Sequence, residues 1–335
     1  MTDAHIIGPR GTDRDAWLAD HGLDQASVIA LPSDASPRKY FRLDGTGLLL
    51  VQVAPHDPDQ QTFTRVADHL NRLGLSAPAT RAADPAAGFY LVEDFGHRTY
   101  SRELRSGGDE TTLYASAVDA IAALHAAPNA TAITLPPYAA AFLLSEAQIF
   151  ADWFSPRVNP ALDQSGFHAK FSALWQHALR PVADSRATLV LRDFHLDNLI
   201  HLPDRGGLRS CGLIDVQGAL IGAPEYDLAS LLQDARRDLA PGLEDAMLDR
   251  YAFERPNMNH AAFTARYHLL AAQRHTKIAG LFIRLAQRDD KTGYLGHLPR
   301  VLGHLETALR LAGLDEIRAL LDSSLPDWQH GQSKA

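Results

Sequence analysis

Apolar residues alternate in short runs in the first part of the chain and recur at helical spacing in the rest. Runs that end at Pro, Asp or Gly predict strands over 26–32, 40–44, 48–54 and 89–92. Between the third and fourth of these runs, apolar residues at helical spacing extend from 63 to 73, and Gly74 supplies a stop. The pattern predicts an amphipathic helix packed on a small sheet.

After Asp94 the pattern becomes mainly helical. Stretches rich in Leu and Ala, such as Leu113–Ala126, repeat apolar residues three and four positions apart. Within this part, short apolar runs predict strands over 188–191, 199–202 and 208–214. Strands followed by helices around a small hairpin favour an α+β fold with two lobes, a β-rich lobe over 1–94 and a mainly helical lobe over 95–335.

Composition excludes several classes of protein. The 335 residues are 46% hydrophobic and 21% charged, which is ordinary for a globular chain. A formal net charge of -8 argues against nucleic acid as a partner, because a polyanion would be repelled. No stretch has the length and apolarity of a membrane span or a signal peptide, so we expect a cytoplasmic protein with a small-molecule partner. The single cysteine, Cys211, excludes an internal disulfide and is expected to be buried in a strand. The oligomeric state stays open.

Two carboxylates and one amide stand at predicted strand ends. Asp193 follows the run 188–191, Asn198 comes five residues later, and Asp215 closes the run 208–214. Phosphoryl transfer needs a carboxylate that accepts the proton of the acceptor hydroxyl, and oxygen ligands that hold magnesium against the phosphates. The spacing predicts Asp193 as the base and Asn198 and Asp215 as magnesium ligands. The alternative is that Asp193 and Asn198 only hydrogen-bond a tight turn.

The chain resembles the aminoglycoside phosphotransferase-like kinases, and within them the anomeric kinases of N-acetylmuramate and N-acetylglucosamine. The resembling blocks run in order through almost the whole chain: SDASPRKYFRL, GFYLVEDFGHRTY, LRDFHLDNLI, GLIDVQGALIGAPEYDLASLLQD and QRHTKIAGLFIRLAQRDDKTGYLGHLPR. The resemblance implies a protein-kinase-like fold, ATP and Mg²⁺ as cofactors, and transfer of the γ-phosphoryl group to the anomeric hydroxyl. The product would be a sugar 1-phosphate used in recycling cell-wall sugars.

The chain departs from the wider pattern of that family in three places. Position 191 is Leu where the wider group commonly has His. The third predicted strand carries Gln52 in place of the phosphate-binding Lys, and no Glu occurs between residues 54 and 92 to pair with such a Lys. The usual Lys-Glu ion pair therefore cannot form in its usual place.

Other cations and amides are expected to hold the triphosphate. Lys39 and Arg42 are the predicted phosphate contacts, with Arg38 beside them, and a solvated strand edge is the alternative for Lys39. The loop 33–40 has no glycine, so Ser33, Ser36 and backbone amides would have to form its cradle.

Further residues are candidates by position. Glu93 and Phe95 follow a predicted buried strand, where backbone groups could hydrogen-bond adenine, and an interdomain turn is the alternative. The predicted substrate contacts are His195, Gln217, Glu146 and Arg274. For His195 the alternative is a turn residue, for Glu146 a surface position, and for Arg274, beside His275 and Lys277, a solvated helix face. Asp227 is expected to be a helix N-cap, with support of the catalytic loop as the alternative.

Two other functions stay open at this point. A kinase of another small hydroxylated acceptor, such as choline, homoserine or an aminoglycoside, shares the same chemistry. A nucleotide-binding pseudokinase is conceivable because of Leu191 and the missing Lys-Glu pair.

Overall fold

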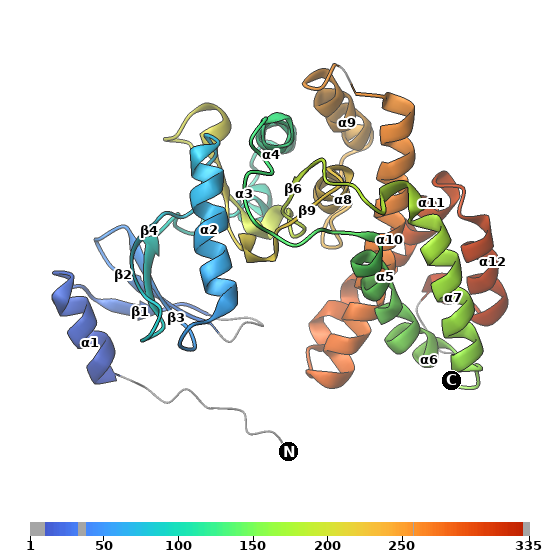
Figure 1. Ribbon diagram of the computed structural model, residues 1–335, viewed down its shortest axis with the longest axis horizontal. Coiled ribbons are helices and arrows are strands. Elements are labelled where there is room, and N and C mark those ends of the chain that lie inside the picture. The colour runs from blue at the N-terminus through green and yellow to red at the C-terminus, as the bar shows by residue number, and fades with distance from the viewer. Residues whose placement is uncertain (1–10, 33–37, 257, 331–335) are drawn as a thin grey trace. The chain divides into compact units, whose positions relative to one another are not determined.

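The computed structural model describes residues 11–32, 38–256 and 258–330 (Figure 1). Contacts within the chain divide it into two units. The first unit contains the residues up to Gly107 together with 197–218, and the second contains 108–196 and 219–335. This division differs from the lobe boundary expected at residue 94, because 95–107 and 197–218 group with the sheet. The expected boundary stays a prediction.

Five antiparallel strands form the sheet of the first unit, in the order β1-β2-β3-β5-β4. Four of them were predicted from apolar runs. Strand β4 was missed because TRAAD contains one β-branched residue, Thr80, and no aromatic residue. The bounds are Val28–Ala30 (β1), Lys39–Leu43 (β2), Leu48–Gln52 (β3), Thr80–Asp84 (β4) and Phe89–Glu93 (β5).

The two faces of this sheet have different neighbours. Helix α1 (Gly11–Asp20) places Leu18 in a cluster with Leu50 and Leu91 on one face. Because side chains alternate along a strand, Leu49 points to the opposite face, toward Phe63 of helix α2 (Pro58–Arg72). The sequence predicted α2, whose N-cap Asp57 accepts a hydrogen bond from Gln60 N at 2.7 Å, but not α1, which has too few apolar residues to show a period.

A short hairpin completes the first unit and explains why 197–218 belongs to it. Strand β7 (Leu199–His201) pairs with β8 (Cys211–Leu213), and isolated bridges join Ser76 to Gly212 and Thr99 to Ile200. The predicted strand over 208–214 is too long, since Gly207–Ser210 is a 3₁₀ turn (η4). Cys211 is fully buried in β8, as expected. Helix α3 (Tyr100–Arg105) packs beside β7.

Helices make up most of the second unit, with one small sheet. Its strands are β6 (Thr188–Val190) and β9 (Leu220–Gly222), which pair antiparallel, and β9 was not predicted. No helix in the described part of the chain has the length and apolarity needed to cross a bilayer. The helices are α4 (Glu110–Ala126), α5 (Ala140–Ile149), α6 (Ser155–Val158), α7 (Gln164–Ala178), α8 (Glu225–Leu232), α9 (Leu243–Phe253), α10 (His260–Arg288), α11 (Leu298–Leu311) and α12 (Asp315–Ser324).

The long helix α10 runs through the centre of this unit and packs against α5, α8 and α11 (Figure 1). It approaches the end of α5 closely at Gly280. A Cβ atom there would lie 2.4 Å from the carbonyl oxygen of Ile149, where α5 passes into the π-helical turn Phe150–Phe154 (η1). Backbone therefore lies against backbone at this crossing, which only glycine permits.

Candidate active site

A cavity of about 330 Å³ lies within the first unit, on the face of the sheet opposite α1. The strands contribute Leu49 and Val92 to its apolar wall, and the hairpin contributes Ile200. A cavity lined mainly by apolar residues, with a few polar groups among them, suits a planar base that carries polar substituents. Five residues predicted for the site line this cavity: Arg42, Glu93, Phe95, Asn198 and Asp215.

The predicted metal ligands are brought together by the hairpin. Asn198 directly precedes β7 and Asp215 comes two residues after β8, and Ile214 N donates to the Asn198 carbonyl oxygen at 3.1 Å. Asp215 is exposed and has a left-handed backbone, with φ of 59°. Its Oδ1 accepts a hydrogen bond from Gln217 Nε2 at 2.6 Å, so Gln217 contacts the carboxylate itself. A carboxylate and an amide oxygen fit Mg²⁺, which prefers oxygen ligands.

The segment after β5 is held by two arginines. Asp94 pairs with Arg42, whose Nη2 lies 3.0 Å from Oδ1, and Glu93 pairs with Arg205. The guanidinium of Arg205 also lies over the ring of Phe95, 4.7 Å from its centroid. The side chains of Glu93 and Phe95 thus hold the segment in place. The backbone N–H of Glu93 donates to the carbonyl oxygen of Ala79 at 2.9 Å, so the predicted adenine contact would have to use other backbone groups of the segment.

The cations near the predicted triphosphate site differ in burial. Lys39 is exposed at the start of β2, opposite Gln52, whereas Arg38 is only 6% exposed. Arg38 lies 3.5 Å from Asp59 at the first turn of α2. Arg42 already pairs with Asp94, so it would have to break this ion pair in order to bind a phosphate. Ser33 and Ser36 lie outside the described residues.

Asp193 lies in the second unit, in the turn that follows β6. The backbone N–H groups of Leu191 and Arg192 donate to the two carboxylate oxygens of Asp227, both at 2.8 Å. Arg192 has a left-handed backbone, with φ of 68°, and such strain is often found at functional sites. The predicted N-cap role of Asp227 is wrong, because α8 is capped at Pro224 and Asp227 is inside its first turn. Asp227 instead anchors the turn that carries Asp193.

Cations surround Asp193. Burial disfavours its charged form, but Lys277, Arg274 and other nearby positive groups outweigh this effect and hold the pKa of Asp193 below its ordinary value. The carboxylate is therefore ionised at neutral pH, as a proton acceptor must be. His195 is 9% exposed, and burial lowers its pKa, so its imidazole is uncharged at neutral pH.

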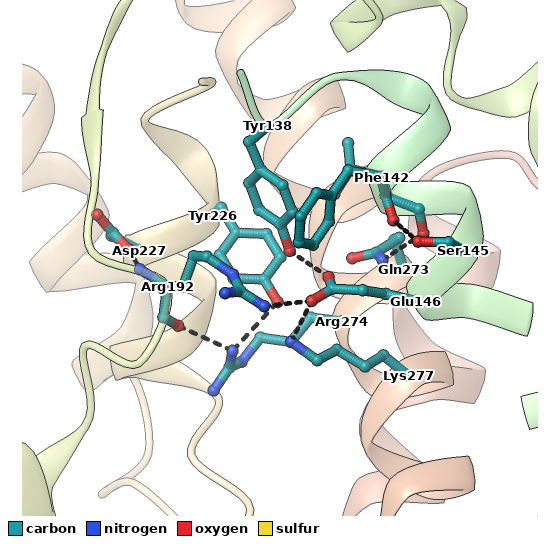
Figure 2. A network of polar contacts seen from close by, with 11 residues as sticks. Tyr138, Phe142, Ser145, Glu146, Arg192, Tyr226, Asp227, Gln273, Arg274 and Lys277 are labelled. Atoms are coloured by element: carbon teal, nitrogen blue, oxygen red, sulfur yellow. Dashed lines mark hydrogen bonds and ion pairs between the residues drawn. The ribbon is translucent and has the colours of Figure 1, made fainter. Parts of the chain in front are cut away.

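The predicted substrate residues Glu146 and Arg274 belong to one buried network (Figure 2). Glu146 accepts from Lys277 at 2.7 Å, from Arg192 and from the hydroxyl of Tyr138. Arg274 donates to the carbonyl oxygen of Arg192 at 3.0 Å and to the hydroxyl of Tyr226 at 3.3 Å. A surface position for Glu146 and a solvated face for the 274–277 cluster are both wrong, because these side chains are buried.

Sequence reasoning missed several of these partners. Tyr138 lies in an irregular segment before α5, and Arg205 lies in the connection between β7 and β8. Neither position carries a periodic or motif signal that distinguishes it from an ordinary loop residue. Lys277 was visible as part of a basic cluster, but its pairing with Glu146 depends on the packing of α5 against α10.

Known proteins resemble this chain over most of its length. A family model described as the phosphotransferase enzyme family matches residues 27–261. The chain belongs to this phosphotransferase family. A relative from Caulobacter vibrioides named N-acetylmuramate/N-acetylglucosamine kinase is 37% identical over 303 residues, which cover 88% of this chain and 82% of that protein. A relative of the same name from Pseudomonas aeruginosa is 32% identical, with 90% of this chain and 89% of that protein covered.

The solved structure of an aminoglycoside phosphotransferase with ADP bound shares the fold of this phosphotransferase-family chain. The TM-score is 0.58 at 17% identity, and the match covers 89% of this chain and 99% of the other. The predicted α+β, kinase-like fold is therefore confirmed, and so is the predicted resemblance to this family.

Proposed function

We propose that the chain transfers the γ-phosphoryl group of ATP to the anomeric hydroxyl of N-acetylmuramate or N-acetylglucosamine. The observation that carries the proposal is the name shared by the two relatives that are 37% and 32% identical over nearly the whole chain. The product would be a sugar 1-phosphate, which suits the recycling of cell-wall sugars in the cytoplasm, where ATP is available.

The cavity of the first unit supports the proposed nucleotide site. Its apolar wall would take the adenine, with backbone groups of Glu93 and Phe95 as hydrogen-bonding partners. Lys39 and Arg42 stay the predicted phosphate contacts, and the burial of Arg38 makes it a further candidate.

Asn198 and Asp215 would hold Mg²⁺, whose contribution when bound is to offset negative charge on the phosphates. Gln217 supports this role, because its hydrogen bond fixes the orientation of the Asp215 carboxylate. Asp193 would accept the proton of the anomeric hydroxyl and orient its oxygen for attack. The lowered pKa of Asp193 keeps this group ionised at neutral pH.

The nature of the product tests the proposal directly. Phosphorus NMR of reactions with ATP, Mg²⁺ and each amino sugar should show a 1-phosphate resonance coupled to the anomeric proton. A 6-phosphate, or turnover only with choline, homoserine or an aminoglycoside, would assign another acceptor. Absence of magnesium-dependent turnover with every acceptor would indicate a nucleotide-binding pseudokinase.

The role of Asp193 is tested by Asp193→Asn, which keeps the size of the side chain but cannot accept the proton. We expect kcat to fall by about a hundredfold or more, the usual contribution of a general base. ATP binding, measured by calorimetry, should change little, because the residues proposed for nucleotide binding are unchanged. A variant that keeps more than about a tenth of the wild-type rate would remove Asp193 from the base role.

A further inference from the structure

Arg205, in the connection between β7 and β8, contacts two residues of the segment that follows β5. Its guanidinium pairs with the carboxylate of Glu93, and its central carbon lies 4.7 Å from the ring centroid of Phe95. Its Nη1 also donates to Ser76 Oγ at 3.3 Å. The side chain of Arg205 is 26% exposed, so water only partly screens these contacts. One arginine therefore holds side chains at two positions of the segment.

The ring of Phe95 has a further neighbour in the same hairpin, Gly212 of β8. A Cβ atom added to Gly212 would lie 2.8 Å from Cδ2 of that ring, so the ring packs against strand backbone. Gly212 is in turn bridged to Ser76, the residue to which Arg205 donates. The hairpin thus contacts Phe95 both through a guanidinium and through its backbone.

These contacts affect the cavity of the first unit although Arg205 does not border it. Among the residues that the structure describes, Glu93 and Phe95 line the cavity and Arg205 does not. A shift of these two residues would change the wall on which adenine is proposed to lie. Any effect of Arg205 on the base would therefore pass through Glu93 and Phe95.

We propose that Arg205 is a positioning residue for the nucleotide base, because it holds Glu93 and Phe95 in the arrangement that receives adenine. This proposal depends on the proposed function, in which the cavity binds ATP. As a cation, Arg205 has one rival role, which is attraction of the triphosphate. Two ligands separate the roles: adenosine carries the base without phosphates, and tripolyphosphate carries phosphates without the base.

The test compares dissociation constants for ATP, adenosine and tripolyphosphate in wild type and in Arg205→Met. Calorimetry measures ATP directly, and displacement of ATP measures the other two. We expect the constants for ATP and adenosine to rise by the same factor, about fivefold, and that for tripolyphosphate to stay unchanged. Loss of an ion pair and a cation–π contact lowers the fraction of molecules whose segment is arranged for binding. Arg205→Lys, which keeps the charge but not the planar group over Phe95, should give an intermediate value.

Two further variants show whether the effect passes through the segment. Glu93→Gln removes the ion pair from the other side and should also weaken adenosine binding. Combined with Arg205→Met it should add little, because the same contact is already lost. Arg209→Met is the matched control: its side chain is exposed in η4, and its carbonyl oxygen, which accepts from Ser76 Oγ at 2.8 Å, is kept. It should bind all three ligands as wild type does.

Weaker binding of ATP and tripolyphosphate with unchanged adenosine binding would overturn the proposal in favour of a phosphate contact. Unchanged binding of all three ligands would overturn it while leaving the proposed function intact. Equal losses for all three, with a lower melting temperature, would show only a general structural role and would also overturn it. A wild-type protein that does not bind ATP would defeat the proposed function itself. If Arg205→Met does not fold, Glu93→Gln decides with the same three ligands.

Discussion

Gly280 allows no side chain, and its substitution should test the crossing of α5 and α10. In Gly280→Ala the new Cβ would lie 2.4 Å from the carbonyl oxygen of Ile149, and backbone cannot rotate away as a side chain can. We expect the free energy of unfolding to fall by about 1–3 kcal/mol, the usual cost of overpacking. Urea denaturation measures the change.

Gly303 on α11 provides the matched control for the same substitution. It is exposed in the same unit, and an added Cβ would meet no atom within 4 Å. Gly303→Ala should therefore stabilise the protein by about 0.5–1 kcal/mol, because alanine is the better helix former. Equal effects of the two substitutions would show that helix propensity, and not the close crossing, decides the outcome at Gly280.

Single residues were predictable from the sequence when their role depends on neighbours along the chain. Asp193, Asn198 and Asp215 were found because turns between short strands fix their spacing, and the structure brings Asn198 and Asp215 to one cavity. The partners of Glu146 were not found, because Tyr138 lies in an irregular segment and Lys277 meets Glu146 only through the packing of α10 against α5. The catalytic role of Asp193 and the metal-binding roles of Asn198 and Asp215 stay predictions.

At the scale of elements, α8 supports the turn that carries Asp193 through a single carboxylate. Asp227→Asn replaces one accepting oxygen with an amide nitrogen, so either the N–H of Leu191 or that of Arg192 loses its partner. An unsatisfied buried N–H costs about 1–3 kcal/mol. We expect a lower melting temperature and about a tenfold loss of kcat, with nucleotide affinity unchanged.

The exposed carboxylate of Asp245, in the first turn of α9, gives a matched control. Asp245→Asn should leave both the melting temperature and kcat close to wild type. If Asp227→Asn behaves in the same way, the anchoring role of α8 is wrong.

Elements with a strong apolar period were predicted well, and those without one were missed. The period of α2 and the apolar runs of β3 and β5 located these elements to within a few residues. The strand β4 and helix α1 have weak patterns, since tertiary contacts such as Leu18 against the sheet stabilise them. Asp227 was misplaced because a residue one turn into a helix and an N-cap residue look alike in sequence.

For the whole molecule, buried histidines should make stability depend on pH. His275 is fully buried, and burial together with nearby positive groups holds its pKa well below the ordinary value. The unfolded chain binds a proton at this position below about pH 6.5 whereas the folded chain does not, so stability should rise with pH between about 5 and 7. Buried His125 and His195, whose pKa values are also lowered, act in the same direction.

Urea midpoints at pH 5.5 and 7.5 measure this dependence. Each such histidine can contribute up to about 1.4 kcal/mol per pH unit, and His275→Gln should reduce the difference between the two midpoints. His177→Gln, at an exposed position on α7, should leave the difference as it is in wild type. Equal wild-type midpoints at the two pH values would contradict the argument.

The burial of the single thiol has a practical consequence. Cys211 is inaccessible within β8, and burial raises the pKa of its thiol to about 12, so the reactive thiolate is absent from the native protein. Alkylating reagents can reach it only when the hairpin of the first unit opens. The natural chain therefore contains its own reporter of local opening in that unit, and a cysteine introduced on the surface could carry a fluorophore without removal of the native one.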